Sequence, residues 1–274
     1  MTTEHAPEYV GARRVLLSAL EALGSHRKAV VLVGAQAIYL RVGPGDLQVA
    51  PFTTDGDLAL NPDVLDDEPL LAEALSAAGF SLAAKPGTWA RDDVQIDLMV
   101  PMALGGPGRR GADLGAHGRE VARKAKGLEA ALVDNSVFTL TALEESDTRT
   151  LDVAVAGLAA LIVAKLHKLV EREATPPRWA PKDGLDVLRM LQAGNLGKLG
   201  ETLARLERHP IAGATTQGAR AHLPHLFGTQ GAHGVAMAVR ASVGVEAAAT
   251  IAASCEVLAN ELLRAWGAAL TNNS

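Results

Sequence analysis

The chain has 274 residues, enough for one large domain or two small ones, and 48% of them are hydrophobic although only 3% are aromatic. This composition is typical of a helix-rich protein with a core of leucine, valine and alanine, and it excludes a disordered chain. The formal net charge of −5 excludes a general attraction to nucleic acid, so a polyanion would need a local basic patch.

The content of cysteine and of apolar segments indicates the compartment. A single cysteine, Cys255, excludes an internal disulfide and is typical of the reducing cytoplasm. The first residues, MTTEHAPEYV, are polar and lack a secretory signal pattern. No uninterrupted apolar stretch approaches the roughly 18 residues of a membrane span. We therefore expect a cytoplasmic protein that does not cross a membrane.

The first part of the chain predicts alternating helices and strands. Leucines at helical spacing predict a helix over 11–24, and the apolar run 28–33 predicts a buried strand that leads into a short helix over 35–42. The patterns that follow predict a helix over 68–79, a loop over 103–118 and strands at 56–60, 80–84, 93–100 and 148–155.

From residue 157 onward the pattern is helical, apart from a glycine- and histidine-rich interval over 210–235 that predicts irregular structure. His222 and His225 lie in that interval and are expected on the surface. The predicted fold is an α/β domain over 1–155, with a mixed sheet flanked by helices, followed by an all-helical domain over 156–274.

Three aspartates lie on predicted strands. Alternation along the strand places Asp55 and Asp57 on one face and leucines on the other, and Asp97 lies opposite the aliphatic residues of 93–100. If the two strands are neighbours, the three carboxylates converge, and a hard cation such as Mg²⁺ would relieve their repulsion. The alternative is that they are solvated strand-end residues, which is how we interpret the acid pairs at 66–67 and 92–93.

Gly34 lies between the predicted strand and the helix that follows it. A glycine there permits a tight turn and leaves backbone N–H groups at the helix N-terminus available to a phosphate. The alternative is that Gly34 only permits close packing.

The helix predicted over 157–172 carries a basic row beside its leucine stripe. Lys165 falls at the edge of the stripe, with Lys168 and Arg172 near it, whereas His167 and Glu171 are expected to face away. Because a buried ammonium needs a partner, the row should meet anions. Those anions are either a triphosphate or salt-bridge partners beside a lysine that reaches water.

The segment PKDGLDVLRML supplies two candidate partners. Asp183 and Asp186 lie three residues apart on one side of a predicted helix. They could pair with Lys165 and Arg172, or act in a reaction.

Taken in order, these motifs resemble the nucleotidyltransferase superfamily, and more specifically the AbiEii/AbiGii-type toxins of abortive-infection systems. The resemblance rests on LVGAQA, TTDGDL, VQIDLMV and KLHKLVER followed by KDGLD, and it covers roughly residues 29–190. Many members have a Gly-Ser turn, where this chain has Gly34-Ala35-Gln36.

The resemblance implies Mg²⁺-dependent transfer of a nucleoside monophosphate from an NTP, with release of pyrophosphate. Asp55 and Asp57 would bind two metal ions, and Asp97 would be the third carboxylate, placed to activate the acceptor hydroxyl. The residues expected to contact the nucleotide are Gly34, Ala35, Gln36, Thr53, Lys165, Lys168, Arg172, Asp183 and Asp186.

The acceptor stays open: a tRNA 3′ end, a protein hydroxyl or a small molecule. A basic tract could meet RNA phosphates or be a solvated basic helix; it comprises Arg109, Arg110, Arg119, Arg123, Lys124 and Lys126. The resemblance also suggests a toxin held by an antitoxin protein.

Two rival functions remain. One is a catalytically inactive regulator or partner-binding protein with the same fold, and the other is an aminoglycoside-modifying nucleotidyltransferase. Hydrolases are disfavoured because the sequence lacks G-x-S-x-G, H-E-x-x-H and G-K-[ST] motifs.

Overall fold

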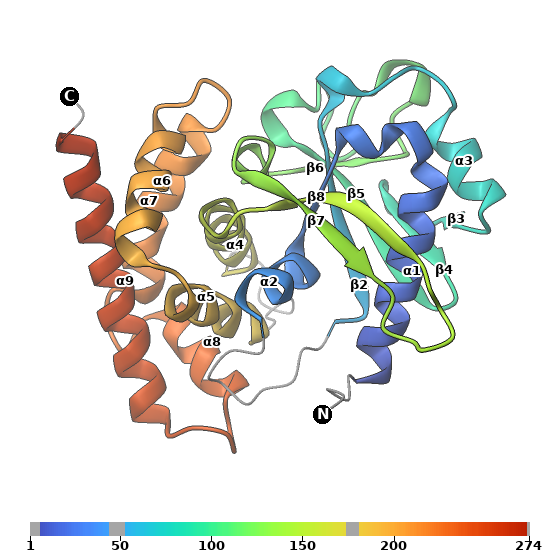
Figure 1. The fold of residues 1–274 in the computed structure, drawn as a ribbon. Helices are drawn as coiled ribbons and strands as arrows, with labels where there is room; N and C mark the ends of the chain where they lie inside the picture. Colours follow the sequence, from blue (N-terminus) through green and yellow to red (C-terminus); the bar gives the residue numbers. More distant parts are fainter. Residues whose placement is uncertain (1–5, 44–52, 174–180, 273–274) are drawn as a thin grey trace. The chain divides into compact units, whose positions relative to one another are not determined.

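A computed structural model describes residues 6–43, 53–173 and 181–272 (Figure 1). The chain divides into two compact units: Met1–Ala37 with Ala50–Ala156, and Ile38–Val49 with Gly157–Ser274. The first unit combines a mixed sheet with helices, and the second is helical. The predicted class is confirmed at this level, whereas a nucleotidyltransferase-like arrangement stays a prediction.

The described part of the first unit contains one mixed sheet of eight strands, whose order is β3-β4-β5-β2-β1-β8-β7, with β6 paired to β5 (Figure 1). The strands are β1 (Val30–Val33), β2 (Asp55–Leu60), β3 (Ser81–Leu82), β4 (Thr88–Arg91), β5 (Val94–Pro101), β6 (Arg123–Ala125), β7 (Asn135–Thr141) and β8 (Thr150–Ala156). The helices are α1 (Pro7–Leu23), α3 (Leu71–Ala77) and the first residues of α2 (Gly34–Val42), which continues into the second unit from Ile38 on. The 3₁₀ turns are η1 (Gly24–Ala29), η2 (Pro62–Val64), η3 (Met102–Leu104), η4 (Gly115–His117) and η5 (Glu129–Leu132).

The apolar face of β2 and β5 determines how the sheet is covered. Leu58 and Leu98 are fully buried, as the alternation predicts, and α1 packs on both strands. An ideal Cβ on Gly56 would lie 3.3 Å from the Leu16 side chain of α1. The aliphatic residues of β2 and β5 therefore face α1, and the residues that alternate with them face the other side of the sheet.

Three strands have no counterpart among the predictions. They are β4, β6 and β7, and each is stabilised by pairing with a strand elsewhere in the sheet. The strands β4 and β6 are short, and most residues of β7 are exposed, so none of the three has the continuous apolar pattern that identifies a buried strand.

In the described part of the second unit, the helices pack on one another, with α6 against α9, α5 against α8 and α4 against α7. They are α4 (Leu158–Glu173), α5 (Lys182–Ala193), α6 (Leu196–Glu207), α7 (Gly213–Phe227), α8 (His233–Ala241) and α9 (Ala248–Thr271). Within the described ranges, no helix has both the length and the apolar character needed to cross a membrane.

Two predictions for this unit are wrong. The interval 210–235 is largely helical, because Ala219, Leu223 and Phe227 of α7 recur every four residues and are fully buried. His167 does not face away: it is buried, its ring centroid lies 5.0 Å from that of His222, and its Nε2 lies 2.7 Å from the Thr215 carbonyl oxygen. The helix α4 therefore has a second buried face, against α7.

Candidate functional site

The register of the central strands brings two of the three predicted aspartates together. The strand β2 pairs with β5 in parallel, and Asp57 lies directly beside Asp97. Residues opposite each other in a register share a face, and Asp55 shares it too because it lies two residues before Asp57. We name Asp55, Asp57 and Asp97 the sheet carboxylates. All three are half-buried.

Asp55 is held at the start of β2 by side chains from two other segments. The hydroxyl of Thr53, which is fully buried, donates to Asp55 Oδ1 at 2.5 Å. Gln36 Nε2 donates to the Asp55 carbonyl oxygen at 3.2 Å, and Gln36 Oε1 accepts from Arg13 Nε at 2.9 Å. Two predicted nucleotide contacts, Thr53 and Gln36, therefore position Asp55 in this structure.

Gly34 is the first residue of α2, and it lies against the carboxylate of Asp57. Its φ is +69°, and an ideal Cβ at this position would lie 2.1 Å from Asp57 Oδ2. Any side chain would therefore collide with the carboxylate as well as strain the backbone. The first N–H groups of a helix have no partner within it. This geometry is compatible with both interpretations of Gly34, as a phosphate-binding turn and as a residue that permits close packing. The packing is against the side chain of Asp57.

Asp97 is surrounded by donors. Thr88 of β4 lies opposite it in the sheet and donates from Oγ1 to Oδ1 at 2.7 Å. Arg123 of β6 donates to Oδ2 from its terminal nitrogen NH2 at 2.7 Å and from Nε at 3.3 Å, and Lys85 Nζ lies 3.7 Å from Oδ2. Burial acts to raise the pKa of Asp97, but the charge of Arg123 and the hydrogen bonds outweigh it, so the pKa lies below its usual range.

Arg123 is a partner of Asp97 that the sequence interpretation missed. The two residues are 26 positions apart, and the sequence places Arg123 in a basic tract. The alternative of a basic helix is wrong, because this tract forms a loop and the strand β6. Two other members also have partners: Arg119 pairs with Asp113, and Lys124 donates to the carbonyl oxygens of Gly106 and Gly108.

The sheet carboxylates have the oxygen donors that Mg²⁺ prefers, on one face of neighbouring strands. Among residues 6–43, 53–173 and 181–272, however, the structure shows no three acidic, histidine or cysteine side chains gathered closely enough to hold a metal ion. The carboxylate of Asp97 instead accepts a hydrogen bond from Arg123, and that of Asp55 accepts one from Thr53. The donor types and their shared face suit a metal ion, but the three side chains are not gathered around one point in this structure, so the two-metal site stays a prediction.

Five other predicted site residues lie together in the second unit. With Arg189, which the sequence interpretation did not include, they form a group that we name the buried ion cluster: Lys165, Lys168, Arg172, Asp183, Asp186 and Arg189. Lys165 Nζ lies 2.5 Å from Asp183 Oδ1 and 2.9 Å from Asp186 Oδ2. Both aspartate side chains are fully buried, and that of Lys165 is 5% exposed. Arg172 also pairs with Asp183. Of the two roles open to these acids, pairing with Lys165 and Arg172 is the one the structure shows.

Charge compensation explains how the cluster tolerates burial. Burial acts to lower the pKa of Lys165, but Asp186 and Asp183 more than offset it, so that pKa is raised. Burial acts to raise the pKa of Asp183, but Lys165, Lys168 and Arg172 more than offset it, so that pKa is lowered. Lys168, at 39% exposed, and Arg172, at 27%, keep part of their side chains in contact with solvent. Contact of this basic row with a nucleotide stays a prediction.

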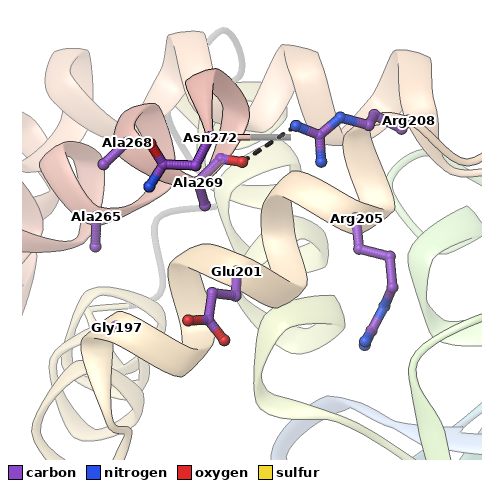
Figure 2. A pocket seen from close by; sticks show the side chains of 8 residues that line it. All are labelled: Gly197, Glu201, Arg205, Arg208, Ala265, Ala268, Ala269 and Asn272. Atoms are coloured by element: carbon purple, nitrogen blue, oxygen red, sulfur yellow. Dashed lines mark hydrogen bonds between the residues drawn. The ribbon is translucent and has the colours of Figure 1, made fainter. Parts of the chain in front are cut away.

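A hollow of about 700 Å³ lies between α6 and α9, and Figure 2 shows the residues that line it. Arg208 bounds it by donating to the carbonyl oxygens of Ala269 and Leu270 at 3.1 and 2.9 Å. It is lined by Gly197, Glu201, Arg205, Arg208, Ala265, Ala268, Ala269 and Asn272, so it contains none of the predicted site residues.

Comparison with known proteins leaves the site to be interpreted from its own geometry. No protein-family model, no curated protein and no solved structure matches this chain.

Proposed function

We propose that this chain is a Mg²⁺-dependent nucleotidyltransferase that transfers a nucleoside monophosphate from an NTP to a hydroxyl group. The observation that carries the proposal is the register of β2 and β5, which sets Asp57 beside Asp97 with Asp55 on the same face. Gly34, at the start of α2, lies against Asp57 and adds a helix N-terminus suited to a phosphate. The order of these motifs along the chain also supports the assignment.

In the proposed reaction, the acceptor oxygen attacks the α-phosphorus of the NTP. A bond forms between these atoms, the bond from the α-phosphorus to the bridging oxygen breaks, and the electron pair leaves with pyrophosphate. Metal ions held by Asp55, Asp57 and Asp97 would stabilise the phosphate charge and lower the pKa of the acceptor hydroxyl. Asp97, whose pKa lies below its usual range, is ionised at neutral pH and would orient the hydroxyl by accepting its hydrogen bond. The hydroxyl proton passes to water.

The test uses each α-labelled NTP with Mg²⁺ and three acceptor mixtures: total tRNA, cell-lysate protein and small molecules that include an aminoglycoside. We expect wild type to label one mixture and Asp57→Asn to lose at least about a hundredfold of the rate, as removal of a charged catalytic group does. Equal labelling by wild type and Asp57→Asn would refute the assignment.

Asp152→Asn is the matched control. Asp152 lies on β8 and accepts from Thr139 Oγ1 at 2.7 Å, as Asp97 does from Thr88, but it is exposed and lies outside the sheet carboxylates. We expect this variant to transfer label at the wild-type rate. The acceptor that becomes labelled would also decide between an RNA-modifying toxin, with its expected antitoxin, and an enzyme that acts on small molecules.

A non-catalytic regulator is the second candidate, and the pairing of Asp97 with Arg123 favours it. A regulator that had lost catalysis could keep the nucleotide site or lose it. Calorimetric titration of Mg²⁺–NTP, together with the label-transfer assay, separates the cases. The proposed enzyme binds nucleotide only with the metal present and transfers label, a regulator that keeps the site binds without transfer, and a regulator that has lost the site shows neither.

A further inference from the structure

The position of Arg123 is fixed by the backbone contacts of β6 with its neighbours. Gly87 lies between β4 and β6 with φ +74°, and an ideal Cβ there would lie 2.5 Å from the backbone nitrogen of Arg123. On the other edge, Lys124 N donates to the Arg110 carbonyl oxygen at 2.8 Å. Within the sheet, Arg123 lies opposite Met99, two residues beyond Asp97 on β5. The backbone of β6 is thus fixed between neighbours, and its arginine is directed at Asp97.

Among the described residues, two cationic side chains lie near Asp97, and their exposure to solvent indicates which of them neutralises its charge. The side chain of Lys85 is 61% exposed and its Nζ lies 3.7 Å away, so water and salt screen its charge. The side chain of Arg123 is 23% exposed, and its guanidinium makes two hydrogen bonds to a carboxylate that is itself 16% exposed. Arg123 is therefore the cation that neutralises Asp97.

We propose that Arg123 is the resident cation of the sheet carboxylates and sets their affinity for a divalent metal ion. A metal ion that takes Asp97 as a ligand must compete with the guanidinium for Oδ2. The positive charge of Arg123 also reduces the net negative charge of the sheet carboxylates, which weakens their attraction for the ion. Arg123 is a positioning residue, because it acts through Asp97. The inference rests on the proposed metal site, but it concerns binding and requires no turnover.

The test is binding of Mn²⁺ alone to the full chain, followed by electron paramagnetic resonance of the free ion. We expect Arg123→Gln to bind Mn²⁺ about tenfold more tightly than wild type, which corresponds to about 1.4 kcal/mol. Arg119→Gln is the matched control, since Arg119 forms an exposed 2.7 Å pair with Asp113, and its affinity should equal that of wild type. The double variant Arg123→Gln/Asp97→Asn should lose the gain.

A second substitution keeps the test decisive if Arg123→Gln fails to fold. Arg123→Lys keeps the charge but loses the planar fork, so we expect an intermediate gain in Mn²⁺ affinity. The inference is overturned if the folded Arg123 variants bind Mn²⁺ no more tightly than wild type, or if the double variant keeps the gain. The proposed function is judged separately, by label transfer: a gain in Mn²⁺ affinity without any transfer would reject the enzyme and leave the role of Arg123 standing.

Discussion

The two groups of charged residues in this chain handle their aspartates in opposite ways. In the buried ion cluster, Asp183 and Asp186 are fully enclosed and meet lysine and arginine side chains on several sides. The sheet carboxylates are half-buried, and Asp97 has one closely bound arginine. Carboxylates that are neutralised from within contribute to the scaffold, whereas carboxylates that keep access to solvent can still bind a ligand.

The largest expected effect is a loss of stability when the buried ion cluster is broken. Lys165→Met would leave two buried carboxylates short of their shared partner, and breaking such a pair typically costs about 4 kcal/mol of the free energy of unfolding. Urea unfolding followed by circular dichroism measures it. Lys198→Met, at an exposed position in α6, should change stability by less than about 0.5 kcal/mol. A Lys165→Met protein of wild-type stability that no longer bound NTP would instead make Lys165 a ligand contact.

The next effect separates close packing from backbone strain. Gly34→Ala adds a methyl group where Asp57 Oδ2 lies, at a positive φ, and should cost about 3 kcal/mol. Gly43 has a similar φ of +65° but open space around it, so Gly43→Ala should cost only about 1 kcal/mol. Comparing the two unfolding free energies isolates the contact between Gly34 and Asp57. Equal costs would mean that the carboxylate is not held against the turn.

A smaller effect tests how strongly Asp97 is held. Thr88→Val keeps the shape of a buried side chain but removes its 2.7 Å hydrogen bond to a carboxylate, at a cost of about 1.5 kcal/mol. Thr139→Val removes the equivalent bond to the exposed Asp152 and should cost less than about 0.5 kcal/mol. Similar values for both variants would show that Asp97 is no better enclosed than a surface residue.

The smallest expected effect is that of pH, between about 5 and 9, on the stability that the buried ion cluster contributes. The lowered pKa of Asp183 contributes stability above its unfolded pKa of about 3.9, and that stability is lost as the pH falls through the folded pKa. The raised pKa of Lys165 contributes stability below its unfolded pKa of about 10.4, and that stability is lost as the pH rises through the folded pKa. The contribution of the cluster is therefore constant between these limits.

Urea titrations of wild type and Lys165→Met across pH 3 to 9 check this prediction. The difference in unfolding free energy between wild type and the variant should shrink as the solution is acidified below about pH 4. A difference between the two proteins that instead changed steeply between pH 6 and 8 would contradict the assignment, because it would indicate a histidine.

Much of the sheet and of the site could be predicted because their signals are local. Alternation along β2 and β5 predicts which residues face α1, and the burial of Leu58 and Leu98 confirms it. Whether β2 and β5 were neighbours could only be assumed, because no local pattern encodes the pairing of strands that are about 40 residues apart.

The features that the sequence interpretation missed depend on distant partners. Arg123 reaches Asp97 because Gly87 allows β6 close to β5, and a basic tract contains no sign of that approach. The strand β6 exists through this pairing. In α7, the glycines and histidines hid an apolar residue at every fourth position, and packing on neighbouring helices outweighs their weak propensity.

The most direct test of the central claim is to locate the metal ion. A crystal of the full chain, soaked with Mn²⁺ and a non-hydrolysable NTP analogue, would place the ion by its anomalous scattering. We predict a peak in contact with the carboxylates of Asp57 and Asp97, with the guanidinium of Arg123 moved off Asp97. A bound analogue without a peak at these carboxylates, or a peak held only by residues elsewhere, would contradict the account.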